Sequence, residues 1–105
     1  MLKKDNDSLR AARLIWDCWE KGETVTKLPD VFKPKTINEG YAIQAHFEEF
    51  TTNPLFGWKI AATSAAGQNH IGVSGPLAGR LISERVFKAG SILKFGTNRM
   101  AVAEP

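Results

Sequence analysis

The stretch Gly57-Trp58-Lys59-Ile60-Ala61-Ala62-Thr63-Ser64 places one lysine inside an apolar, strand-like run and follows it directly with two hydroxyl side chains. Burying an ammonium group in such a run without a partner is costly. Lys59 is therefore either a charge on an edge strand, where lysine discourages aggregation, or a group with a chemical role. Thr63 and Ser64 favour the start of a helix at the end of this run.

The half of the chain after Pro54 has strand-like patterning. Strands are predicted over 56–62, 91–95 and 99–103, and a short helical segment is predicted over 64–70. The glycines at positions 72, 75, 79 and 90 indicate turns, and their spacing does not match a dinucleotide-binding loop.

Two helices are predicted before this region. Asp7 or Ser8 can cap a helix that runs to about Lys21 and stops at Gly22. The apolar face expected for it, which suits a core or a subunit contact, consists of Leu9, Ala12, Trp16 and Trp19.

The second helix begins with a capping box, in which the Thr36 hydroxyl and the Glu39 carboxylate each bond to backbone amides. We expect the helix to end at Asn53-Pro54. One face should carry Ile37, Tyr41, Gln44 or Ala45, and Glu48, with Ala42 and Phe47 on neighbouring faces. The proline-bearing segment between the two helices is typical of extended backbone. The chain is thus predicted to be α+β, with an N-terminal helical region over 1–54 and a β-rich region over 55–105.

Composition excludes several classes of function. The formal net charge of +3 comes from scattered residues, with no basic run longer than a pair, which does not indicate a nucleic-acid partner. No apolar run is long enough to cross a bilayer, and the N-terminus lacks the apolar core of a signal peptide. Cys18 is the single cysteine. A cytoplasmic protein without a membrane or nucleic-acid partner is therefore expected.

The last residues, Arg99 to Pro105, form a strand-like segment without a following turn or polar tail. The residues after Pro54 are also few for an independent β-core. We therefore expect the chain to be the N-terminal portion of a longer protein, with its β-rich region incomplete.

Several short motifs follow one another along nearly the whole chain. They are Leu9 to Trp19, Thr36 to Gln44, Gly57 to Ile60 with Thr63-Ser64, Gln68, Gly72-Val73, Pro76 with Gly79, and Ala103-Glu104-Pro105. In this order they resemble the 2-keto-4-pentenoate hydratase family, which includes the related 4-oxalocrotonate decarboxylases and belongs to the fumarylacetoacetate hydrolase superfamily. The resemblance implies N-terminal helices that lead into a mixed β-roll.

The resemblance also implies a divalent metal, Mg²⁺ or Mn²⁺, held by a Glu-x-Glu pair and a later acidic residue. Glu104 matches the first glutamate of that pair, and its partner would follow Pro105. One carboxylate cannot complete the oxygen-rich site that Mg²⁺ requires, so the site is expected to be incomplete in this chain.

The implied reaction is that of a lyase, a hydratase or decarboxylase that acts on small 2-oxo acids in aromatic-compound catabolism. A 2-oxo acid chelates the metal, which stabilises the enolate formed beside the carbonyl. Lys59 matches the family's catalytic lysine, which would pair with substrate oxygens or assist proton transfer. Thr63 and Ser64 would bind substrate through hydroxyl and backbone donors, although a plain helix cap is the simpler interpretation of these two residues.

Two departures from the family pattern leave alternatives open. Ala61 stands where many members have glycine, and Leu77 stands where many hydratases have aspartate. The loss of that carboxylate puts in doubt the role of adding water to the substrate. The alternatives are an acylpyruvate-type carbon–carbon hydrolase and a non-catalytic assembly module derived from the same family. The 105-residue chain alone is expected to be inactive. Trp16, Trp19 and Phe56 suggest apolar surface that a second subunit covers, so a homo-oligomer is expected.

Overall fold

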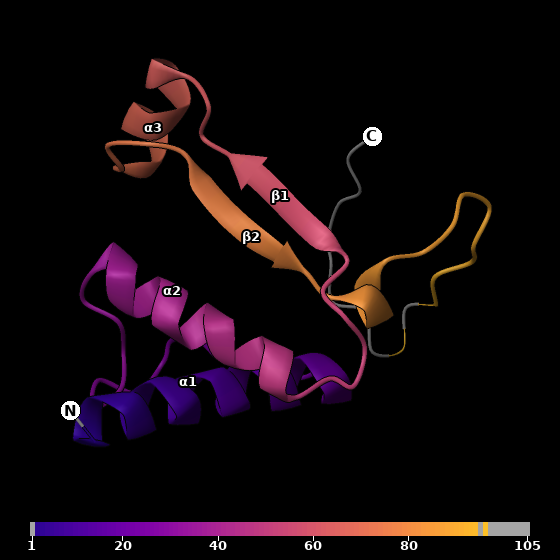
Figure 1. The fold of residues 1–105 in the computed structure, drawn as a ribbon, viewed down its shortest axis with the longest axis horizontal. Helices are drawn as coiled ribbons and strands as arrows, with labels where there is room; N and C mark the ends of the chain where they lie inside the picture. The colour runs from indigo at the N-terminus through magenta and orange to yellow at the C-terminus, as the bar shows by residue number, and fades with distance from the viewer. Residues whose placement is uncertain (1, 95, 97–105) are drawn as a thin grey trace. The chain divides into compact units, whose positions relative to one another are not determined.

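The computed structural model describes residues 2–94 and residue 96. Figure 1 shows helices first and then an antiparallel pair of strands, so the prediction of an α+β chain is confirmed for the described residues. The elements in order are α1 (Leu2–Lys21), α2 (Ile37–Ala45), the 3₁₀ helix η1 (His46–Glu49), β1 (Gly57–Ala61), α3 (Ala65–Ile71), β2 (Leu77–Leu81) and the 3₁₀ helix η2 (Ser83–Arg85).

The described residues form two compact units. The first, the helical unit, contains the residues up to Phe50 together with those after Phe87, and the second, the hairpin unit, contains Thr51–Phe87. No helix in the described part of the chain combines the length and the apolar content needed to cross a membrane.

Helix α1 ends as predicted but begins earlier. Gly22 adopts a φ of 67°, and the amides of Gly22 and Glu23 bond to the carbonyls of Trp19 and Cys18 at 3.4 and 2.9 Å. These two bonds define a Schellman ending, which requires the left-handed conformation that glycine adopts freely. The predicted start at Asp7 or Ser8 is wrong, since both residues lie inside the helix and Asp7 pairs with Arg10 at 3.6 Å.

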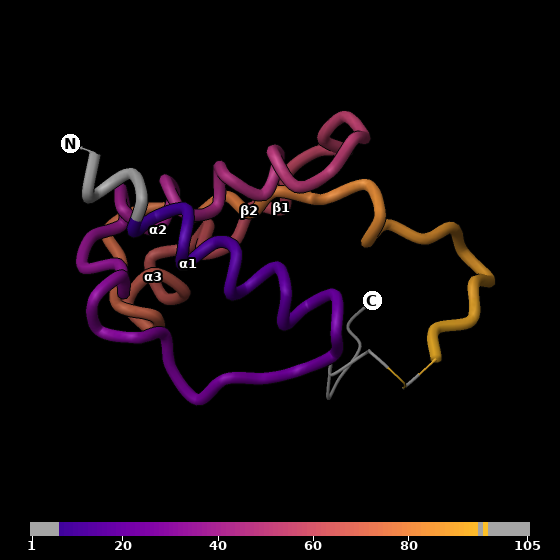
Figure 2. The backbone as a smooth tube through the Cα atoms, turned by 90° about the horizontal axis from the view of Figure 1, so that it is seen from below, coloured from indigo at the N-terminus to yellow at the C-terminus, as the bar shows by residue number. Residues whose placement is uncertain are grey.

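Helices α1 and α2 lie side by side and run in the same general direction, as both views show (Figures 1 and 2). Segment 22–36 therefore travels back along α1 before α2 begins. The Thr36 hydroxyl accepts a hydrogen bond from the Glu39 amide at 3.1 Å, which confirms the predicted cap. The Glu39 carboxylate accepts from the amide of Lys35 at 2.6 Å, one residue before the cap.

The core of the helical unit lies where α1 meets α2. Its buried members are Ala11, Ala12 and Ile43, and the partly buried residues packed against them are Ile15, Leu28, Phe32, Phe47 and Phe50. Small alanines on α1 allow close approach of Ile43, whereas Ile37 is 49% exposed. The buried residue of α2 is thus Ile43, which the predicted faces did not include, and α2 ends earlier than predicted, at Ala45.

Trp16 joins this core through its ring. Only 6% of it is exposed, and its ring centroid lies 6.0 Å from that of Phe47 and 5.6 Å from that of Phe50. Edge-to-face and tilted pairs of this kind are favourable beyond their burial. Trp19 remains 39% exposed, so the interpretation of both tryptophans as surface to be covered holds only for Trp19.

Strands β1 and β2 pair antiparallel in the hairpin unit, with Gly57 opposite Leu81, Lys59 opposite Gly79 and Ala61 opposite Leu77. Strand β1 confirms the predicted strand closely. Strand β2 was not predicted, because Gly75, Pro76 and Gly79 together resemble turn sequence. The predicted strand over 91–95 is wrong for residues 91–94, which form none, while Phe95 and the predicted strand over 99–103 lie outside the described residues.

The segment before β1 is held by η2. The Ser83 hydroxyl donates to the Pro54 carbonyl at 2.6 Å, and the Phe56 amide donates to the Leu81 carbonyl at 3.0 Å. A hydrogen bond from the Thr51 side chain lowers the pKa of Glu84 below its ordinary value, with smaller contributions from Asn53 and Arg85. These bonds join the two ends of the hairpin unit.

Candidate functional site

Lys59 lies on β1 with its side chain exposed. Its ammonium Nζ donates to the backbone carbonyl of Ile60 at 3.2 Å. Gly79 stands opposite Lys59 on β2, so no side chain covers it from the paired position. The cost of burying a charge, which first drew attention to Lys59, therefore does not arise in this structure.

Ser64 is the N-cap of α3. It has an extended backbone, and its Oγ accepts a hydrogen bond from the amide of Gly67 at 3.0 Å. The simpler interpretation of Ser64 as a helix cap is thus confirmed. Its hydroxyl still has a proton to donate, and both Ser64 and Thr63 are exposed at the surface.

The turn between β1 and α3 is tightly built. Ala62 adopts a φ of 56°, a left-handed conformation that is unfavourable for alanine. Its carbonyl accepts a hydrogen bond from Nε2 of Gln68 at 3.0 Å. A Cβ atom at Gly67 would lie only 3.3 Å from Ser64 Oγ and 3.5 Å from Ala62 Cα, so glycine allows the helix to approach the turn.

Gln68 and Gly67 therefore hold the backbone that carries Thr63 and Ser64. No role was predicted from the sequence for either residue, although Gln68 is one of the residues that carry the family resemblance. The sequence signal that could have shown both was the spacing Ser64-x-x-Gly67-Gln68, because a serine cap bonds to the amide three residues ahead.

The predicted metal ligand Glu104 lies outside the described residues. Among the residues that the structure does describe, no group of three histidine, cysteine, aspartate or glutamate side chains could hold a metal ion. These residues by themselves therefore do not fit the divalent metal that the family resemblance implies.

The hairpin unit brings Lys59, Thr63 and Ser64 into one short piece of structure, with the first on β1 and the others on the turn that follows. His70 lies in the last turn of α3, and His46 in the helical unit pairs with Glu49. Cys18 is partly buried within α1.

Comparison of the chain with protein-family models, with curated proteins and with solved structures gives no match.

Proposed function

We propose that this chain is the N-terminal segment of a metal-dependent lyase, a hydratase or decarboxylase, that acts on small 2-oxo acids of the 2-keto-4-pentenoate type. The observation that carries the proposal is the exposed Lys59 on β1, followed at once by a hydrogen-bonded turn that presents Thr63 and Ser64. An exposed cation next to hydroxyl donors suits an anionic, oxygen-rich substrate.

In this proposal Lys59 binds a carboxylate or keto oxygen of the substrate. Its only hydrogen bond in the described part of the chain goes to the neighbouring Ile60 carbonyl, a weak local contact that a charged substrate replaces at little cost. Thr63 and Ser64 donate hydroxyl protons to the same anion. The Gln68 bond keeps the turn in place while substrate enters and leaves.

The implied Mg²⁺ or Mn²⁺ would need carboxylates beyond the described residues, Glu104 among them. When bound, such a cation supplies stabilisation of negative charge on the substrate oxygens. The described residues contribute the lysine and the two hydroxyl groups, and the chain alone is proposed to be inactive.

Isothermal titration of Mg²⁺ and Mn²⁺ with oxalate tests the proposal. The measurement compares this chain with a version extended by the codons that follow residue 105 in its gene. We expect metal-dependent oxalate binding in the extended version only. In that version Lys59→Met should weaken binding about tenfold or more, because a charged hydrogen bond is lost, and the exposed Lys88→Met should leave it unchanged.

Three results would overturn the proposal. They are a stop codon directly after residue 105, absence of metal-dependent binding in the extended version, and equal binding by the Lys59 and Lys88 variants.

A second candidate is a non-catalytic assembly module. The observation that favours it is the apolar surface of the hairpin unit, where Phe56 is 63% exposed and Trp58 and Ile60 are each 48% exposed. An assembly module would form a stable oligomer and bind neither metal nor oxalate, so the titration separates the two candidates.

A further inference from the structure

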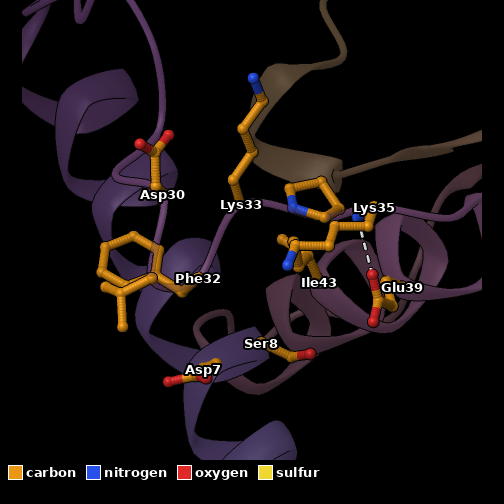
Figure 3. A pocket seen from close by; sticks show the side chains of 10 residues that line it. Asp7, Ser8, Asp30, Phe32, Lys33, Lys35, Glu39 and Ile43 are labelled. Atoms are coloured by element: carbon orange, nitrogen blue, oxygen red, sulfur yellow. Dashed lines mark hydrogen bonds between the residues drawn. The ribbon is translucent and has the colours of Figure 1, made fainter.

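A small cavity lies within the helical unit, between α1, α2 and the segment that returns from one to the other (Figure 3). Its volume is about 180 Å³, room for a molecule of a few heavy atoms. The residues that line it are Asp7, Ser8, Asp30, Val31, Phe32, Lys33, Pro34, Lys35, Glu39 and Ile43. The cavity is separate from the residues proposed above for lyase chemistry, since none of them lines it.

Ser8 is the buried polar group of this cavity. Only 9% of its surface is exposed, and its hydroxyl forms no hydrogen bond with the residues that the structure describes. In Figure 3 the hydroxyl points into the cavity, toward the side on which Glu39 lies. Ser8 Oγ is not among the fully buried unpaired atoms of the described residues, so the hydroxyl is accessible from the cavity. A ligand in the cavity can accept its proton.

Lys35 supplies a cation at the same cavity. Its backbone amide donates to Glu39, but its ammonium group forms no ion pair with any described residue. Figure 3 shows the Lys35 side chain extending across the cavity, whereas Lys33 extends away from Ser8. Ser8 and Lys35 therefore bring a hydroxyl and an ammonium group to this cavity, both of which donate hydrogen bonds.

The carboxylates around the cavity are already engaged. Asp7 pairs with Arg10 at 3.6 Å, Asp30 pairs with Lys27 at 3.9 Å, and Glu39 accepts from the amide of Lys35. They nevertheless leave negative charge at the rim, which opposes an ion of high charge. A ligand that accepts from Ser8 and Lys35 should thus carry a single negative charge.

The remaining wall is apolar. Phe32 and Pro34 are partly buried and Ile43 is 5% exposed, so they offer a surface for a short hydrocarbon chain. We propose that this cavity binds a small monocarboxylate with a short apolar chain, whose carboxylate accepts hydrogen bonds from the Ser8 hydroxyl and the Lys35 ammonium and whose chain packs against Phe32, Pro34 and Ile43.

The test is a titration of the chain with sodium propionate, followed by amide NMR shifts at constant ionic strength. We expect saturable shifts at the cavity residues with a dissociation constant of about 1–10 mM, as suits so small a ligand. Ser8→Ala and Lys35→Met should each weaken binding about tenfold or more. Ser8→Ala keeps α1 intact because alanine favours helices, and Lys35→Met keeps the backbone amide that bonds to Glu39.

Lys33→Met is the matched control, since it removes a lysine that lines the cavity but extends away from Ser8. Its affinity for propionate should stay within about twofold of the parent. Inorganic phosphate should bind more weakly than propionate. The proposal is overturned by shifts that do not saturate, by equal losses in the Lys33 and Lys35 variants, or by unchanged affinity in Ser8→Ala.

Discussion

Ala62 shows how a single residue can be held in an unfavourable conformation by its neighbours. Its φ of 56° costs alanine about 1–2 kcal/mol, and glycine does not bear this cost. The hydrogen bond from Gln68 to the Ala62 carbonyl and the close approach of Gly67 offset it. Strained residues are found at functional sites, which agrees with the place of Ala62 between Lys59 and Ser64.

Ala62→Gly is expected to stabilise the hairpin unit by about 0.5–1 kcal/mol, because glycine adopts positive φ without strain. Amide hydrogen exchange at the paired residues of β1 and β2 measures this change. The matched control is Ala61→Gly, one residue earlier in regular strand, where glycine should weaken the strand instead. Slower exchange in the Ala61 variant than in the Ala62 variant would contradict the expectation.

We expect Glu84 to make the stability of the hairpin unit depend on pH. Its pKa is lowered in the folded chain, first by the hydrogen bond from Thr51. A carboxyl group with a lowered folded pKa contributes stability above its ordinary pKa, and that contribution is lost as the pH falls through the folded pKa. The hairpin unit should therefore weaken as the solution is acidified below the ordinary pKa of glutamate.

Glu84→Gln should reduce this loss of stability under acid, because the variant has no carboxylate to protonate. Thr51→Val should do the same by removing the hydrogen bond that lowers the pKa most. Urea unfolding at a series of pH values compares both variants with the parent. Parallel stability profiles for all three chains would show that Glu84 does not set this dependence.

At the scale of single elements, helix ends followed local rules. Gly22 and Gly72 both have positive φ, 67° and 75°, and both close helices whose last carbonyls bond to the residues beyond. Gly40, in contrast, lies inside α2 with helical backbone. Added Cβ atoms at Gly40 and Gly72 would meet nothing within 4 Å, so backbone conformation alone separates the two positions.

Gly40→Ala should therefore stabilise the chain by about 0.5–1 kcal/mol, since alanine is the better helix former. Gly72→Ala should destabilise it by about 1 kcal/mol, since alanine is strained at positive φ. Thermal unfolding followed by far-ultraviolet circular dichroism gives both values. The same sign of change in the two variants would contradict the assignment of Gly72 to a left-handed helix ending.

On the scale of the whole molecule, apolar surface remains exposed in both units. Trp19 is 39% exposed in the helical unit, and Phe56 and Trp58 are 63% and 48% exposed in the hairpin unit. A two-stranded sheet is only marginally stable in water by itself. The exposed Phe56 and Trp58 and the marginal stability of a two-stranded sheet both favour coverage of the hairpin unit by further protein. The expectation of an oligomer agrees with this.

Light scattering at working concentration is expected to show a mass above that of one chain. Trp58→Thr should shift the population toward the monomer, because it removes a large exposed apolar side chain. Threonine also favours strands, so β1 should still form. A monodisperse monomer that unfolds cooperatively would contradict the prediction of an oligomer.

The features that could be predicted from the sequence are those settled within a few residues. The cap at Thr36, the cap at Ser64 and the ending at Gly22 each depend on hydrogen bonds between positions three to five apart. Strand β1 was also predictable, because its apolar run is bounded by Pro54 before it and by Thr63 and Ser64 after it. Lys59, Thr63 and Ser64 lie near one another because they are close in the sequence.

Tertiary structure decided what depends on distant partners. Strand β2 forms because β1 pairs with it, which overrides the turn-like appearance of Gly79. Ile43 rather than Ile37 is buried because the alanines of α1 admit it. The lowered pKa of Glu84 and the cavity beside Ser8 likewise arise from contacts between segments far apart in the chain. The sequence by itself thus determined the helix boundaries that carry a capping residue, at Thr36, Ser64 and Gly22. Long-range packing decided which faces are buried, since burial depends on a partner that the local pattern does not contain.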